Sequence, residues 1–263
     1  MLAHQRQALI LEAVRERGGV RVADLVERLG VSDMTVRRDI GELHRRGLVA
    51  RVHGGAASLD ERSSAEPGFA AKAELQTAQK RAIARAAAAL VRPGASVALS
   101  AGTTTVELAR ALRGVPDLTV VTNSPRVADV LHEPGAEEAG RTVVLTGGVR
   151  TPSDALTGPV AVRSVAGLHV DQLFLGVHGL DVRAGLTTPN LAEAETDRAL
   201  VECARSLVVV ADATKWGVVG LATIAGLDAV DVLVTDTEFP DDARDAVRDL
   251  VGDLVTAPEE ETP

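Results

Sequence analysis

A chain of 263 residues is long enough for one small and one medium-sized domain, each with its own hydrophobic core. Its residues are 46% hydrophobic and 25% charged, proportions that are typical of a globular protein. The sequence has neither a run of 18 apolar residues nor a basic segment followed by an apolar one, so we expect no membrane span and no signal peptide. The single cysteine, Cys203, excludes a disulfide framework within the chain, and we expect a reducing, cytoplasmic location.

The net charge of −9 is divided unevenly along the chain. Residues 1–57 carry ten arginines and seven acidic residues, a net charge of +3, whereas the remainder carries a net charge of −12. A basic segment is drawn to the phosphates of DNA, and an acidic body is repelled by them. The division therefore predicts that nucleic acid binds at the N-terminal end.

Apolar spacing in the N-terminal part predicts a helix over 4–17, a short strand over 20–22 and a second helix over 23–29. The short strand is expected to pair with 48–52 to form a small sheet. A glycine-containing turn at 30–32 then leads into a third helix. This order of elements is that of a winged helix-turn-helix.

The third helix carries two different faces. Val36, Ile40, Leu43 and Leu48 keep helical spacing and are expected to pack inward, and Ser32 stands at the N-cap position. The opposite face is basic, and the following RVHGG segment has two glycines that permit a tight turn. A solvated basic helix is the alternative interpretation. The N-cap, the turn, the apolar periodicity and the two glycines occur together, however, and this combination favours a helix that binds DNA. The residues expected to contact DNA are Ser32, Thr35, Arg37, Arg38, Arg45, Arg51, His53 and Gly54.

The chain changes character after this module. The segment SLDERSSAEPG is polar and contains proline and glycine, so we place a linker over 58–74. The domains are thus expected at 1–57 and 75–257, with a disordered tail over 258–263. Residues 70–90 are rich in alanine and other helix formers and are expected to open the second domain.

Short β-branched or apolar runs alternate with helical segments in the second domain, and this alternation predicts an α/β domain with a mostly parallel sheet. The expected strands are 96–99, 118–121, 142–145, 172–175, 207–211 and 232–235, and the expected helices include 106–112, 126–131, 191–204 and 241–251.

Ligands of such sheets bind beyond the carboxyl ends of the strands. The segment SAGTTT follows the first strand, and its glycine, its hydroxyls and the start of a helix could cradle a phosphate; ordinary helix capping is the alternative. Lys215 follows a later strand and could supply a positive charge to a ligand in the crevice at this edge of the sheet. The alternative is that Lys215 is an ordinary solvated lysine in a loop.

These motifs carry a family resemblance. VSDMTVRRDIGEL and GLVARVHGGA, followed by SAGTTT, LTVVTNS, LTGG, FLGVHGLD, GLTTPNLAEAE and VVADATKWG, resemble the successive landmarks of the DeoR/GlpR family of bacterial transcriptional regulators. The resemblance implies a sensor domain similar in fold to ribose-5-phosphate isomerase that binds a phosphorylated sugar or a related metabolite. The effector-binding residues implied by position are Gly102, Thr103, Thr104, Thr105, Asn123, Gly148 and Lys215, with His178 as a further candidate. The family commonly has Asp where Ser100 stands, a departure that leaves the effector's identity open.

The sequence is compatible with two functions. The first is a repressor of carbohydrate-use genes that binds operator DNA as a homodimer or homotetramer and is controlled by the effector. The alternative is a sugar-phosphate isomerase with a regulatory head, but GVHGLD supplies only Asp181 as an acid for proton transfer, so we expect no enzyme. The six histidines are scattered and no nucleotide-binding loop is present, so we expect neither a metal site nor a cofactor.

Overall fold

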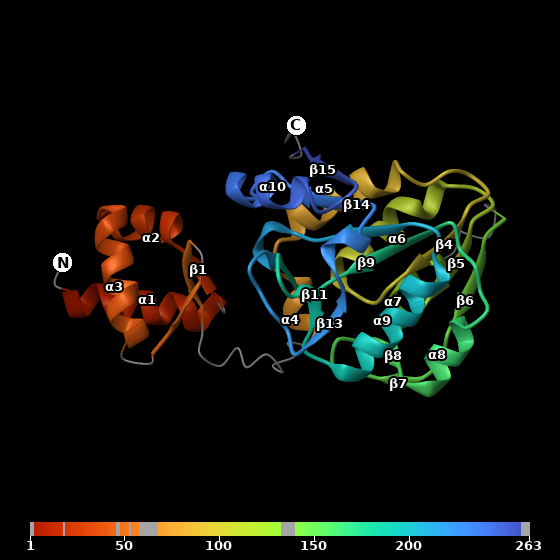
Figure 1. Ribbon diagram of the computed structural model, residues 1–263, viewed down its shortest axis with the longest axis horizontal. Coiled ribbons are helices and arrows are strands. Elements are labelled where there is room, and N and C mark those ends of the chain that lie inside the picture. Colours follow the sequence, from red (N-terminus) through yellow and green to blue (C-terminus); the bar gives the residue numbers. More distant parts are fainter. Residues whose placement is uncertain are drawn as a thin grey trace. The chain divides into compact units, whose positions relative to one another are not determined.

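The computed structural model describes residues 3–17, 19–45, 48–52, 54–57, 68–132 and 140–258. The chain divides into two compact units, residues 1–65 and 66–263, which are called here the head and the sensor domain (Figure 1). Each unit is described by itself.

The described part of the head contains three helices, α1 (Ala3–Arg17), α2 (Val22–Leu29) and α3 (Asp33–Arg45), and three short strands, β1 (Gly19–Arg21), β2 (Ala50–Val52) and β3 (Gly55–Ala57). The strands form an antiparallel sheet in the order β1-β3-β2. Apolar residues from all three helices, among them Ile10, Leu25 and Ile40, fill one core. The expected winged helix-turn-helix architecture is confirmed.

Two expectations for the head are wrong in detail. The first strand pairs with β3, with Val20 opposite Ala56, and not with 48–52, because β3 lies between β1 and β2. Leu48 is 38% exposed, whereas Val49 is fully buried. The chain has already left α3 at that point, so the helical spacing of Val36, Ile40 and Leu43 does not extend to Leu48.

The sensor domain is built on a seven-stranded parallel sheet, as the alternating pattern predicted. Its spatial order is β15-β14-β12-β9-β4-β5-β6. The strands are β4 (Ser96–Leu99), β5 (Thr119–Thr122), β6 (Thr142–Leu145), β9 (Gln172–Gly176), β12 (Leu207–Val210), β14 (Val232–Asp236) and β15 (Asp253–Ala257).

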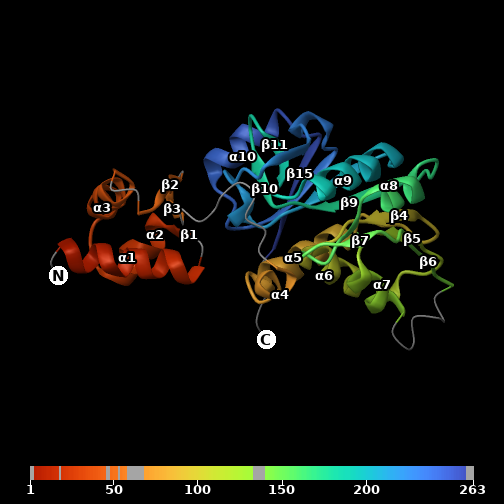
Figure 2. The same cartoon turned by 90° about the horizontal axis from the view of Figure 1, so that it is seen from below.

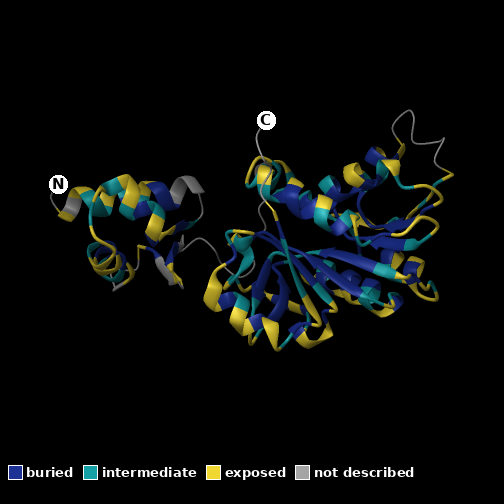
Figure 3. Cartoon of the chain, turned by 90° about the horizontal axis from the view of Figure 1, so that it is seen from above, coloured by how far each residue is buried: buried dark blue, intermediate teal, exposed yellow. Residues whose placement is uncertain are grey.

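Helices cover both faces of this sheet (Figure 2). One face carries α5 (Thr77–Ala88), α6 (Thr103–Ala111) and α7 (Pro125–His132), and the other carries α8 (Pro159–Val165), α9 (Leu191–Cys203) and α10 (Asp241–Arg248). Successive strand residues alternate between two cores: Phe174 packs on the α5 side, and Leu173 and Leu175 pack on the α9 side. The central strands β4, β5, β9, β12 and β14 are accordingly mostly buried, whereas the edge strand β6 is largely exposed (Figure 3).

Several short elements were not predicted. They are helix α8, the hairpin β7 (Val149–Arg150) and β8 (Leu156–Thr157), a small antiparallel sheet of β10 (Gly179–Asp181), β11 (Gly185–Thr188) and β13 (Ala222–Ala225), and the 3-10 turns η1 (Leu112–Gly114), η3 (Ala213–Lys215) and η4 (Leu227–Ala229). Strand β15 was missed as well. A further helix, α4 (Phe69–Ala73), lies within the span expected as linker, and a turn separates it from α5. No helix in the described part of the chain is long and apolar enough to cross a membrane.

Candidate functional site

The start of α3 is fixed by Ser32, as its N-cap position predicted. The Ser32 hydroxyl accepts a hydrogen bond from the backbone N–H of Thr35 at 3.3 Å, and the two hydroxyl oxygens lie 2.9 Å apart. The Ser32 carbonyl accepts from the Val36 N–H at 3.1 Å, which closes the first turn. Capping satisfies N–H groups that the helix itself leaves without partners, so the turn and the helix form one rigid unit.

Contacts on the inner face of α3 fix the rotation of the helix about its own axis. Val36, Ile40 and Leu43 are buried in the head core. Beside them, Arg6 of α1 donates to the carboxylate of Asp39 at 2.7 Å, and both side chains are mostly buried. A charge-assisted bond of this kind fixes geometry as well as energy, so α1 sets which residues α3 turns outward.

The outer face of α3 presents Arg37 and Arg38, both exposed. Arg37 is held along the helix by Asp33 at 2.6 Å, and this carboxylate raises the pKa of Arg37. Among the described residues none accepts a hydrogen bond from Arg38. Met34, in the first turn, is 79% exposed and was not predicted as a site residue. The signal was present, because Met34 is an apolar residue outside the buried stripe.

The turn between β2 and β3 forms the tip of the wing. Gly54 has φ +75°, a conformation that favours glycine, and is exposed. A side chain at Gly55 would collide with the Val20 carbonyl of β1, so this glycine permits the close pairing of β1 with β3. Three of the expected DNA contacts cannot be placed: His53 and the side chains of Arg45 and Arg51 lie outside the described part of the structure.

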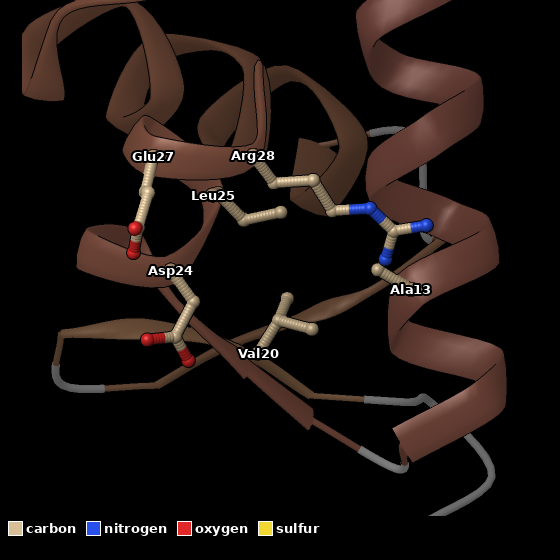
Figure 4. A pocket seen from close by; sticks show the side chains of 6 residues that line it. All are labelled: Ala13, Val20, Asp24, Leu25, Glu27 and Arg28. Atoms are coloured by element: carbon tan, nitrogen blue, oxygen red, sulfur yellow. The ribbon is translucent and has the colours of Figure 1, made fainter. Parts of the chain in front are cut away.

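The head also contains a pocket of about 320 Å3 (Figure 4). It is lined from α1, β1 and α2 by Ala13, Val20, Asp24, Leu25, Glu27 and Arg28. A second, smaller pocket of about 250 Å3 is lined by residues of α10 and β15 and the turn between them, including Arg244 and Thr256. Neither pocket contains a residue expected to bind DNA or effector.

In the sensor domain, the loop after β4 leads directly into α6. Thr105 is fully buried and its hydroxyl donates to the Gly102 carbonyl at 2.9 Å, and Thr104 is buried as well. Thr103 is partly exposed. The loop therefore offers a ligand the first N–H groups of α6 and the Thr103 hydroxyl, since the Thr105 hydroxyl caps the loop from within.

Two buried side chains brace this loop. The amide of Asn123, at the end of β5, accepts from the Ala101 N–H at 2.8 Å and donates to the Leu156 carbonyl at 3.3 Å. The Ser100 hydroxyl accepts from the Gly176 N–H at 3.0 Å and so joins the ends of β4 and β9. Both side chains are about 1% exposed, so they hold the loop in shape from beneath.

Gly148 and His178 lie at two other strand ends. Gly148 is exposed and has φ +124°, and a Cβ atom there would lie 2.6 Å from the Thr157 carbonyl oxygen. This glycine thus permits the hairpin β7–β8 to close beside the sheet. His178 is partly buried, and its backbone N–H donates to the Thr187 carbonyl at 3.1 Å.

Lys215 ends the turn η3, which follows β12. The turn is fixed by two acids: the Asp212 carboxylate accepts from the Thr214 N–H at 3.1 Å, and Asp236, at the end of β14, accepts from the Ala213 N–H at 2.9 Å. Burial raises the pKa of Asp236. Lys215 is partly exposed and stands at the carboxyl edge of the sheet, as predicted.

A second lysine near this edge was missed. Lys80 in the first turn of α5 is only 4% exposed, and burial lowers its pKa to about 8 although the charge of Asp212 opposes the change. The charge of Lys215 acts on it as well. Its spacing from Ile83, Ala84 and Ala87 placed it on the apolar stripe of the helix, and that position was the signal for a buried charge.

The acids considered for proton transfer have structural partners. Asp181 accepts from the N–H groups of Arg183 and Ala184 at 2.8 and 2.9 Å and caps the turn between β10 and β11. Glu193 accepts from the hydroxyls of Thr151 at 2.6 Å and Thr188 at 3.2 Å. No group of three or more histidine, cysteine or acidic residues in the described ranges could hold a metal ion.

Comparisons with known proteins agree with this division into head and sensor domain. Residues 6–62 match the family model of the DeoR-like helix-turn-helix domain, and residues 75–237 match that of the DeoR C-terminal sensor domain. The chain is 39% identical over 248 residues to the HTH-type transcriptional regulator GlpR of Haloferax volcanii, covering 94% of this chain and 95% of that protein. It is 35% identical over 234 residues to the transcriptional repressor AccR of Agrobacterium fabrum, covering 88% and 89%.

Among solved structures, ribose 5-phosphate isomerase A from Neisseria gonorrhoeae aligns with a TM-score of 0.39 and 16% identity over 57% of this chain and 56% of its own. That likeness is too weak to support a conclusion.

A DNA-reading head joined to a sensor domain defines a DNA-binding transcriptional regulator that responds to a small molecule. The chain belongs to the DeoR family of transcriptional regulators. It is a regulator and not an enzyme, which decides between the two functions weighed from the sequence.

Proposed function

We propose that this regulator is a repressor of carbohydrate-use genes and that a phosphorylated sugar or a related metabolite controls its affinity for operator DNA. The DNA contacts proposed from the described head are Ser32, Thr35, Arg37, Arg38 and Gly54, with Met34 added. The repressor role is supported by the name of the relative AccR. The sugar-phosphate effector is supported by the family resemblance of the loops at the strand ends and by their chemistry.

One observation carries the effector proposal. The start of α6 and Lys215 follow β4 and β12, two strands that are separated only by β9 in a parallel sheet. Neighbouring strands are about 4.8 Å apart, so the ends of the two strands from which these features follow lie about 10 Å apart along the same edge. Helix N–H groups and a lysine both favour anions, and a small phosphorylated sugar can span this distance.

The proposal gives the expected effector residues different roles. Gly102, Thr103 and Lys215 are proposed to contact the effector, through backbone N–H groups, one hydroxyl and one ammonium group. Thr104, Thr105 and Asn123 are proposed to shape the loop from beneath, since they are buried. Gly148 and His178 are proposed to border the crevice.

The proposed regulator acts in the cytoplasm as a homodimer or homotetramer. A single recognition helix contacts too few base pairs for selective binding in a genome, and two heads on a two-fold axis read two half-sites.

Thermal unfolding of the full chain across a panel of phosphorylated sugars, with the free sugars as controls, tests the effector proposal. A compound that binds only the folded state raises the melting temperature by mass action. We expect at least one phosphorylated sugar to do so, and we expect the rise to be lost in Lys215→Ala but kept in Arg92→Ala. Arg92 is an exposed residue between α5 and β4, at the amino edge of the sheet, so this control removes the same charge elsewhere. A panel without any stabilising phosphorylated sugar would reject the proposal.

A further inference from the structure

Lys80 is a buried lysine whose hydrogen bonds leave its charge without a carboxylate partner. Its ammonium group donates to the carbonyl oxygens of Lys72 at 2.5 Å and Leu75 at 2.6 Å. An ammonium group has three donors, and within the described part of the chain that of Lys80 forms only these two hydrogen bonds. Two neutral carbonyls do not balance a buried positive charge, so this position favours a further anionic partner.

The acidic side chains whose charges act on Lys80 form hydrogen bonds with other groups. Asp212 and Glu107 are the acidic groups that act on the Lys80 charge, while Lys215 and Lys72 are the basic ones. The Asp212 carboxylate accepts from the backbone and hydroxyl of Thr214, and Glu107 accepts from Arg110. Neither carboxylate forms an ion pair with Lys80.

The position of Lys80 in the fold brings it to the carboxyl edge of the sheet. Helix α5 precedes β4 and packs against α6, β12, β14 and β15. A helix that leads into a parallel strand runs antiparallel to it, so the first turn of α5 lies at the edge where α6 begins. The influence of both Asp212 and Lys215 on Lys80 agrees with this position.

The two carbonyls that Lys80 binds belong to the segment 68–76, the first described part of the sensor domain. The other end of this segment is held by the Phe69 N–H, which donates to the Pro152 carbonyl at 3.1 Å, and by Arg126, whose guanidinium carbon lies 5.4 Å from the centre of the Phe69 ring. The segment is therefore attached to the sensor domain at both ends, and Lys80 provides the attachment nearer to the crevice.

We propose that Lys80 is a second cation of the effector site: its third N–H donates to an anionic oxygen of the effector's phosphate group, while the other two hold the segment 68–76. One ammonium group then binds the ligand and the segment 68–76 at the same time. Effector binding consequently fixes Lys80 and tightens the segment on the sensor domain. This inference rests on the proposed function, because it takes the phosphate to bind at the carboxyl edge.

The chain has only three lysines, Lys72, Lys80 and Lys215, so lysine labelling tests the proposal directly. The full chain labelled with 13C at the lysine Cε is titrated with the phosphorylated sugars that stabilise it, and each signal is assigned by substitution. We expect the signals of Lys80 and Lys215 to shift and that of Lys72 to stay in place. The wild-type shift of Lys80 is informative whether or not a Lys80 variant folds.

A Lys80→Met variant tests two consequences of the proposal, one for effector binding and one for the segment 68–76. Loss of one charge-assisted hydrogen bond is expected to weaken effector binding roughly 10- to 100-fold. Amide hydrogen exchange over residues 69–76 is expected to slow on effector binding in the wild type and not in the variant. Arg85→Met removes a charge from the exposed face of the same helix and is expected to change neither result. The melting temperature of each variant shows that it is folded.

Three results would overturn the inference. Unchanged affinity in Lys80→Met together with an unmoved Lys80 signal would show that Lys80 is not part of the site, and the proposed function would stand. Weaker binding with no effect of the effector on exchange over 69–76 would refute the tightening of the segment. If no phosphorylated sugar moves any lysine signal or the melting temperature of the wild type, the proposed function itself fails and the inference fails with it.

Discussion

At the scale of single residues, buried charges in this protein differ in how they are compensated. Asp39 is paired with Arg6, and Asp154 accepts from Arg126 at 2.7 Å and from Arg150. The hydrogen bond from Arg150 lowers the pKa of Asp154. Asp197 on α9 is different: burial raises its pKa well above the usual range, and the charge of Glu193 adds to this. The ionised form of Asp197 therefore destabilises the fold.

This difference predicts the effect of Asp197→Asn. A carboxyl group with a raised pKa binds its proton more tightly in the folded state, so the wild type loses unfolding free energy as pH rises through that pKa. The amide does not titrate. We expect the variant to be more stable than the wild type by about 1 kcal/mol or more at pH 8, with the difference shrinking toward pH 5. Urea unfolding at several pH values measures it, and a difference independent of pH would contradict the assignment.

For the candidate site, the sequence indicated where the residues lie along the chain but not how their side chains are held. It located the loop 100–105 and Lys215 because strand ends in parallel sheets meet at one edge. It could not show that the Thr105 hydroxyl and the Asn123 amide point into the loop, since that depends on packing against Gly102 and Leu156. It also missed Lys80, because a lysine on an apolar helix stripe is buried only if its ammonium finds acceptors from another segment.

At the scale of elements, long periodic segments were predicted well and short ones were not. The helix 191–204 was found within one residue of α9, and the strands 96–99 and 142–145 coincide with β4 and β6. Elements such as β7 and β8 have two residues each, too few for a period to be recognised. The predicted pairing partner of β1 was wrong. Pairing between strands depends on the path of the chain between them, and a local sequence pattern does not reveal that path.

Helix α3 offers a prediction about an element. Gly41 has φ in the ordinary range, and no atom lies within 4 Å of the position of an added Cβ atom. Close packing therefore does not require this glycine, and Gly41→Ala is expected to stabilise the head by about 1 kcal/mol, because alanine loses less backbone entropy in a helix. Amide exchange of α1 to α3 in the full chain measures the change. Ala23→Gly, on the exposed side of α2, is the reverse control and is expected to destabilise by a similar amount. Faster exchange in Gly41→Ala would contradict the prediction.

At the scale of the whole molecule, charge separates the two activities. The N-terminal 57 residues have a net charge of +3 and the rest of the chain −12, so DNA is attracted to the head and repelled by the sensor domain. The proposed anionic effector requires positive groups in the sensor domain, and the charges of two of the three lysines of the chain, Lys80 and Lys215, act on each other there. Under the proposed function, the net negative charge of the sensor domain repels DNA while its local positive groups bind a small phosphate ester.

The account is tested most directly by the affinity of the full chain for its operator with and without a stabilising phosphorylated sugar, measured by fluorescence anisotropy. Allosteric coupling typically changes an affinity roughly 5- to 150-fold, and for a repressor of carbohydrate-use genes we predict a decrease in that range. Arg38→Ala serves as the control: it should weaken operator binding in the absence of effector and leave effector binding unchanged, whereas Arg28→Ala on α2 should weaken operator binding less. Operator affinity that is the same with and without an effector shown to bind the sensor domain would contradict the central claim.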